Sequence, residues 1–155
     1  MTKKIPYQEF KLRTIFSGEQ KGQKETEQGK IRGKMLLSRS PVSFLGDVNL
    51  DGVVVVDDSD VRGERIDGKI FAFPYGRGST VGTYVILRLS KAGKAPMAII
   101  NKKTESIIAA GAVISRIPLF DSPEPDLFSY LKPGNYEVEI RVGEKESLLR
   151  ILEFF

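Results

Sequence analysis

The 155-residue sequence contains no cysteine and no histidine. Without cysteine the chain forms no disulfide, has no thiolate nucleophile and cannot bind zinc or an iron–sulfur cluster through its own thiolates. Without histidine it lacks the commonest general base near neutral pH, which excludes a Ser-His-Asp triad. Catalysis by this chain therefore needs an unusual base. Any metal must come from elsewhere, so we predict no metal site in this chain.

The sequence also lacks an apolar run long enough to span a membrane, and its N-terminus has no apolar signal-peptide core. We therefore expect a cytoplasmic protein without a membrane partner. Hydrophobic residues make up 41% of the chain and are spread along most of it. At this length such a distribution favours one domain with a substantial core.

Residues 31–155, the apolar-rich part of the chain, have almost no net charge. Residues 1–30 hold seven basic and four acidic side chains and so account for three of the four net positive charges. A domain that binds nucleic acid would concentrate basic side chains on its folded surface. We therefore predict no nucleic-acid partner.

Residues 17–30 contain no apolar side chain, which is typical of a flexible linker. The few apolar residues within 1–16 could add a strand or a short helix. We therefore divide the chain into an N-terminal extension that includes the linker, residues 1–30, and a folded domain, residues 31–155.

Short apolar runs separated by turn residues predict the elements of this domain. Strands are expected at residues 31–37, 53–56, 69–73 and 96–100, and a hairpin at 135–142 and 147–154. Helices are expected after Ser79, from 105 to about 110 with Thr104 as the N-cap, and over 127–132 with Asp126 as the N-cap. The predicted fold class is mixed α/β, with several strands and two or three helices.

Asp47, Asn49 and Asp51 alternate along the chain as ligands do in a calcium-binding loop. The twelfth position of that pattern needs a glutamate and is Asp58 here, and Leu50 replaces a small or oxygen-bearing residue. We therefore interpret this segment as a polar turn.

The most informative segment is residues 73–84, FPYGRGSTVGTY, in which a buried strand leads through a glycine turn into a helix. A helix N-terminus aims backbone N–H groups at a bound anion, and Ser79 adds a hydroxyl there. Arg77, between two glycines, is placed for bidentate contact with a carboxylate or phosphate. The spacing matches neither the P-loop nor the dinucleotide fingerprint. A plainer interpretation, in which Ser79 is only an N-cap, stays open on this pattern.

The helix after this turn is predicted from a four-residue spacing. Val81, Val85 and Leu89 fall on one face, with Tyr84 and Ile86 beside them. We therefore expect this face to pack against the core.

From about residue 31 to its end, the chain resembles the small subunit, or swivel domain, of the aconitase X family. The resemblance rests on an ordered series of motifs: PVSFLGD at 41–47, GK at 68–69, GRGS at 76–79, GKAP at 93–96, AIIN at 98–101, AAGA at 109–112 and IP at 117–118. Within the family the chain is most similar to the archaeal branch that dehydrates phosphomevalonate. Residues 1–30 lie outside the resemblance.

The resemblance implies a single swivelling β/β/α domain, like the mobile small domain of aconitases. It also implies a hydro-lyase, in which water leaves one carbon of a hydroxy acid and a proton leaves the neighbouring carbon, alpha to a carboxylate. The implied partner is the aconitase X large subunit, which holds a [4Fe–4S] cluster and shares the active site. In this branch the product is an anhydromevalonate phosphate, an isoprenoid precursor of the archaeal mevalonate pathway. Alone, the chain is expected to be inactive.

The same resemblance implies the site residues. Ser79 corresponds to the serine that the family uses as proton acceptor, and the expected substrate contacts are Ser43, Gly76, Arg77, Gly78, Thr80 and Thr83. Family members often have a serine at the position of Thr83. Two alternatives stay open: a hydroxyproline dehydratase small subunit of the same family, and a non-enzymatic module that binds an anion at the glycine turn.

Overall fold

The computed structural model describes residues 8–18 and 29–155. The predicted linker at 17–30 falls mainly on residues 19–28, which lie outside the described residues. In the described part the strands are β1 (Glu9–Phe16), β2 (Lys30–Leu37), β3 (Ile70–Ala72), β4 (Ala98–Ile100), β5 (Leu119–Glu124), β6 (Gly134–Arg141) and β7 (Glu146–Phe154). The helices are α1 (Phe44–Asp47), α2 (Gly82–Lys91), α3 (Ser106–Ile114) and α4 (Leu127–Tyr130).

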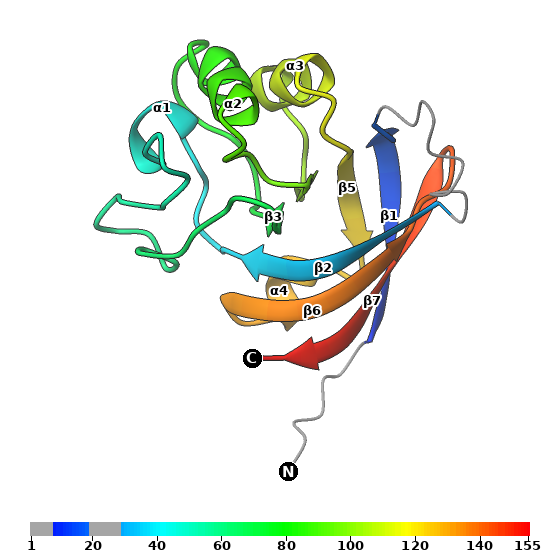
Figure 1. Cartoon of the computed structure of the whole chain (residues 1–155). Helices are drawn as coiled ribbons and strands as arrows, with labels where there is room; N and C mark the ends of the chain where they lie inside the picture. The colour runs from blue at the N-terminus through cyan, green and yellow to red at the C-terminus, as the bar shows by residue number, and fades with distance from the viewer. Residues whose placement is uncertain (1–7, 19–28) are drawn as a thin grey trace.

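The described strands close into a barrel in the order β1-β5-β4-β3-β2-β6-β7. Strands β2, β3, β4 and β5 pair in parallel, whereas β1, β6 and β7 pair with their neighbours in antiparallel fashion. Helices α1, α2 and α3 lie together on one side, next to β3, and α4 lies apart from them near β2 and β6 (Figure 1). The parallel strands are therefore covered by helices on their outer face, as parallel sheets require.

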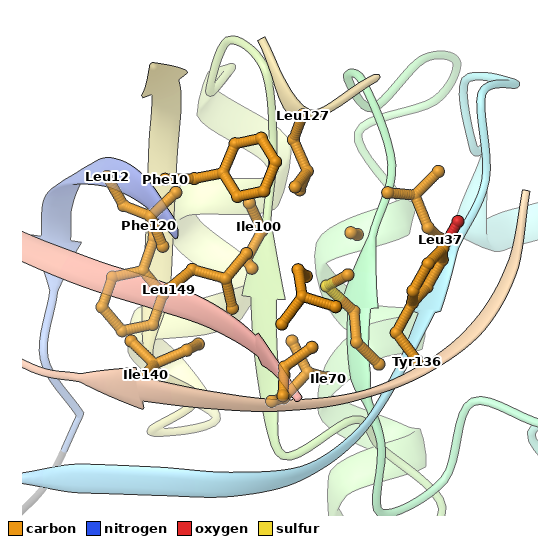
Figure 2. Packing of buried hydrophobic residues seen from close by; sticks show 14 of the residues in the cluster. Phe10, Leu12, Leu37, Ile70, Ile100, Phe120, Leu127, Tyr136, Ile140 and Leu149 are labelled. Atoms are coloured by element: carbon orange, nitrogen blue, oxygen red, sulfur yellow. The ribbon is translucent and has the colours of Figure 1, made fainter. Parts of the chain in front are cut away.

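Alternation along the parallel strands sends side chains into two separate cores, because successive side chains of a strand point to opposite faces. One set fills the barrel interior together with Leu127 and Phe128 of α4, and Figure 2 shows how tightly these side chains pack. The other set, which includes Leu36, Phe71 and Ile99, packs against the helices. Strands β3 and β4 are buried throughout, so they form a fixed platform for the loops that leave them.

Most of the predicted elements are confirmed. Strands lie at 30–37, 70–72 and 98–100, the C-terminal hairpin is β6 and β7, and Asp126 accepts a hydrogen bond from the Phe128 N–H as the N-cap of α4. The description as mixed α/β is only a coarse outline of this closed barrel. Closure depends on pairings between strands that are distant in the sequence, which local patterns do not report.

Two element predictions are wrong. Residues 53–56 form no strand: Val53 and Val54 make single bridges to Arg65 and Val48, and Val55 is exposed. Because these partners lie in short irregular loops, no ladder can extend along the valines.

The N-cap of the third helix is also not where the sequence indicates it. Glu105, not Thr104, caps α3, because its carboxylate accepts hydrogen bonds from the Ile107 and Ile108 N–H groups. The amide of Thr104 instead donates to Asp121 at 3.1 Å.

Strand β1 lies before residue 31 and is nevertheless part of the barrel, between β5 and β7. Its Arg13 forms a two-pronged ion pair with Asp121 of β5, at 2.9 and 3.0 Å, and the Asp121 side chain is fully buried. Burial raises the pKa of the Asp121 carboxyl, but hydrogen bonds from Arg13, Thr104 and Ser122 outweigh burial and hold this pKa below its usual value. The ion pair therefore joins the N-terminal segment to the rest of the fold.

We predict that Asp121→Asn lowers the free energy of unfolding at pH 7 by about 1–3 kcal/mol, because charge-assisted hydrogen bonds to a buried group are lost. The folded-state pKa is depressed, so this stabilisation is present above the pKa of the unfolded state, about 3.9, and is lost as pH falls through the folded value. The difference between variant and wild type should shrink in urea unfolding at pH 3. Glu9→Gln, which removes an exposed pair with Arg150, is the control and should change stability by less than about 1 kcal/mol.

Candidate active site

The loops that follow β2, β3 and β4 meet at one edge of the barrel, because parallel strands bring their carboxyl ends together. Val42 and Gly76 form a parallel bridge between the first two loops. The Lys102 and Lys103 N–H groups donate to the Pro74 carbonyl at 2.8 and 3.2 Å, which joins the third loop to the second. The glycine turn predicted as the functional segment is therefore held from both sides.

Ser79 lies in this turn, partly buried, before the first residue of α2. Its hydroxyl oxygen accepts a hydrogen bond from the Val81 N–H at 3.0 Å, and its carbonyl accepts one from the Gly82 N–H at 2.9 Å. Val81 is the N-cap of α2, so Ser79 caps the turn that leads into the helix and not the helix itself. The hydroxyl therefore has a partner and still reaches the surface.

The N-termini of the two neighbouring helices differ in one respect that matters for binding. At α3 the Glu105 carboxylate occupies the N–H groups of the first turn. At α2 the first-turn N–H groups of residues 82–85 donate to carbonyls of residues 79–81, with no carboxylate involved. In the turn before α2, the N–H groups of Gly78, Ser79 and Thr80 donate to no acceptor within the described part of the chain. The turn that leads into α2 therefore keeps three backbone donors without acceptors next to the positive end of a helix, and such donors favour a bound anion.

Arg77 is held at both ends by the loop after β2. Its N–H donates to the Val42 carbonyl at 3.0 Å, and its Nη2 lies 3.4 Å from Asp47 Oδ2. The Arg77 side chain is 49% exposed, whereas that of Asp47 is 9% exposed. The guanidinium therefore stands at the surface beside the turn, where it can contact a ligand.

Two glycines allow the close packing of the turn. Gly78 has a φ of +96°, and a Cβ there would lie 2.7 Å from the hydroxyl of Ser43. A Cβ at Gly76 would lie 2.5 Å from Ile108 and 2.7 Å from a Glu105 carboxylate oxygen. The turn is thus packed against the Ser43 loop on one side and against the start of α3 on the other, with no room for larger residues.

The two threonines expected in the site are placed differently. The Thr83 hydroxyl donates to the Ile107 carbonyl at 2.8 Å and so ties α2 to α3. This gives Thr83 a structural partner that the sequence did not indicate. Thr80 is exposed next to Ser79, and the structure brings it together with Ser43, Arg77 and the two glycines around one turn.

Apolar side chains are exposed around the same turn. Tyr84 is 66% exposed and Val81 is 44% exposed, so the prediction that they face the core is wrong, whereas Val85, Ile86 and Leu89 are buried as expected. Tyr75 before the turn and Leu45 in α1, the helix next to α2, are exposed as well. We call Leu45, Tyr75, Val81 and Tyr84 the apolar rim. Sequence periodicity could not separate this rim from the core because a helix that carries apolar residues on two faces has no single buried stripe.

Asp47 is the residue of this site that sequence reasoning missed. The sequence pattern indicates only a polar turn there, but the Asp47 carboxylate accepts the Ser43 N–H at 2.8 Å and faces Arg77. The signals in the sequence are its place in the PVSFLGD motif and its position four residues after Ser43, at the end of α1. No group of three or more acidic, histidine or cysteine side chains placed to hold a metal occurs among the described residues. None of the helices in the described ranges is both long enough and apolar enough to cross a bilayer.

Fold and site together define a closed-barrel domain that presents a glycine turn with free backbone N–H groups at the edge where its parallel strands end. The family model described as the aconitase X swivel domain matches residues 19–151, and the chain belongs to this family. The observed fold is accordingly that of the aconitase X swivel domain.

Relatives of named function are similar in sequence. The phosphomevalonate dehydratase small subunit of Methanosarcina mazei is 44% identical over 126 residues, covering 81% of this chain and 85% of that protein. The protein of the same name from Thermococcus kodakarensis is 47% identical over 126 residues, covering 81% of this chain and 90% of that one. A crystal structure of Thermococcus kodakaraensis aconitase X in its holo-form matches with a TM-score of 0.74 and 43% identity, over 92% of this chain and 98% of that chain.

We predict that Gly78→Ala destabilises the fold by about 1–2 kcal/mol, because a Cβ is strained at positive φ and would also displace Ser43. The measurement is chemical unfolding at pH 7. Gly46→Ala is the matched control, because nothing lies within 4 Å of a Cβ at that position. Equal stability of the two variants would contradict the packing described for the turn.

Proposed function

We propose that this chain is the small subunit of a phosphomevalonate dehydratase, a hydro-lyase that removes water from (R)-5-phosphomevalonate to give an anhydromevalonate phosphate in an archaeal-type mevalonate pathway. The observation that carries the proposal is the glycine turn before α2, where the N–H groups of Ser79 and its neighbours Gly78 and Thr80 have no acceptor among the described residues. Relatives that are 44–47% identical and bear this name support the choice of substrate.

Ser79 is proposed as the catalytic base that takes the proton from the carbon alpha to the carboxylate. A serine hydroxyl is a poor base in water, so its site must stabilise the alkoxide. The Val81 N–H already donates to the hydroxyl oxygen at 3.0 Å, and a donor to the charged form favours that form. The helix N-terminus and the nearby positive charge of Arg77 act in the same direction.

The other residues of the turn are proposed to bind the substrate. Arg77 has charge and geometry to hold either the carboxylate or the phosphate of phosphomevalonate. Gly76 and Gly78 let the backbone approach the ligand, and the hydroxyls of Ser43 and Thr80 lie beside them. Because the Thr83 hydroxyl is bound to the Ile107 carbonyl, we assign Thr83 the task of holding α2 in place and no contact with substrate.

A large subunit of the aconitase X family is the proposed partner, and it would carry a [4Fe–4S] cluster. This chain has no cysteine, so all thiolate ligands of such a cluster would belong to the partner. The cluster would act as a Lewis acid on the departing hydroxyl. This chain would supply the base and the anion contacts from the opposite side of the substrate.

The apolar rim supports the idea of docking at this edge. Exposed apolar side chains that gather in one region commonly mark a surface for another protein. A partner that covers Leu45, Tyr75, Val81 and Tyr84 would also close water out of the turn. We propose that the domain swivels on its partner to open and close this site, in the cytoplasm.

We predict that mixing this chain with its separately made large subunit restores dehydratase activity that neither shows alone. Phosphomevalonate and cis-3-hydroxy-L-proline are assayed side by side, and turnover of the first only is expected. Turnover of hydroxyproline only would replace the proposed substrate with that of the other branch. Binding of phosphate by the isolated chain, without any partner or turnover, would favour the non-enzymatic anion module.

We predict that Ser79→Ala reduces kcat of the assembled complex by at least about a hundredfold, because the proton acceptor is removed. Assembly, measured by gel filtration of the mixed subunits, should be unchanged. Ser90→Ala, on the last turn of the same helix, is the control and should retain wild-type turnover. Near-normal turnover of Ser79→Ala would rule out this serine as the base.

A further inference from the structure

The carboxylate of Asp47 contacts two segments of the site, the loop of Ser43 and the glycine turn at Arg77. Its Oδ2 accepts the Ser43 N–H at 2.8 Å and lies 3.4 Å from Arg77 Nη2. The Asp47 side chain is almost completely buried, and the backbone of Asp47 is fixed by hydrogen bonds to Ser43 and Val55. This oxygen is therefore held in place where it meets the Arg77 side chain.

The contact uses only one nitrogen of Arg77. Among the described residues, Nε and Nη1 of this guanidinium donate to no acceptor. The fork of an arginine binds carboxylate or phosphate through two parallel N–H groups on one edge, either Nε with Nη2 or Nη1 with Nη2. Asp47 takes one of the two N–H groups of Nη2, so the other edge keeps both of its N–H groups for an anion. Asp47 thus fixes one corner of the guanidinium and leaves another edge open to a ligand.

Stability alone does not explain why a buried carboxylate stands here. Removing a carboxylate from water is unfavourable, and a partner that is half exposed returns little of that free energy. A charge that restricts an arginine to one orientation, by contrast, lowers the entropy lost when a ligand binds. We infer that Asp47 is a positioning residue that aims Arg77 at the substrate anion; this inference rests on the proposed function.

The test is Asp47→Asn in the assembled complex. An asparagine oxygen can still accept the Ser43 N–H, so the loop is kept while the charge that orients Arg77 is lost. We expect Kd for phosphomevalonate, measured by calorimetry at fixed salt, to rise about tenfold, the effect of one good charge-assisted contact.

The direction of the change in Kd distinguishes the orientation of Arg77 by Asp47 from a simple effect of the Asp47 charge on the anion. Removing a negative charge beside an anion site would by itself tighten binding, so an unchanged or lower Kd in Asp47→Asn overturns the inference. The matched control is Asp60→Asn. The Asp60 carboxylate likewise accepts a backbone N–H from the segment after β2, that of Arg39, at 2.8 Å. This variant should leave Kd for phosphomevalonate unchanged.

A double-mutant cycle gives a readout that a purely structural role would not move. An Arg77→Ala background has no guanidinium for Asp47 to orient, so adding Asp47→Asn should change Kd for phosphomevalonate by less than about twofold. The same tenfold factor in both backgrounds would show that Asp47 acts through the loop and would overturn the inference. A wild-type complex that binds phosphomevalonate without dehydrating it would refute the proposed function alone, and a complex with no affinity for it would refute both.

Discussion

The site depends on the parallel pairing of β2, β3 and β4, which brings three loops to one edge of the barrel. Residues 42, 76 and 102 are far apart in sequence, yet their loops are joined there by backbone hydrogen bonds. Both faces of β3 and β4 are buried, so this platform cannot shift without disturbing two cores. A fixed platform of this kind is what a site needs to keep a short, glycine-rich turn in one conformation.

The platform also carries two adjacent helices whose N-termini differ in chemistry. Glu105 closes the end of α3 with its own carboxylate, so that end needs no ligand. The end of α2 has no such carboxylate and carries Ser79 instead, beside an arginine held by a buried aspartate. The electrostatics of this edge therefore favour negative charge at a single point, on a ligand or on the serine oxygen itself.

Local signals in the sequence predicted the parts of the fold that are local. The strand before the glycine turn, the hairpin at the C-terminus and the cap at Asp126 all follow from neighbouring residues, and the structure confirms them. The turn is also predicted from its glycines, and the helix expected after Ser79 begins at Gly82.

The features that sequence missed depend on long-range contacts. The Arg13–Asp121 pair joins residues 108 apart, and its role in holding β1 could not be read from either segment. Asp47 and Arg77 are 30 residues apart, so the sequence offered no reason to pair them. The valines at 53–56 have strand propensity but find only single bridges, since β-propensity counts only where a neighbouring strand exists to pair with.

The central claim is that this chain supplies one serine oxygen to a site that another subunit completes. A competition assay tests it most directly: increasing amounts of the Ser79→Ala chain are added to a fixed amount of wild-type chain and limiting large subunit. The account predicts that dehydratase activity falls in proportion to the fraction of variant, because the variant occupies the partner without a base. Activity that stays constant while the variant demonstrably displaces the wild-type chain would contradict it.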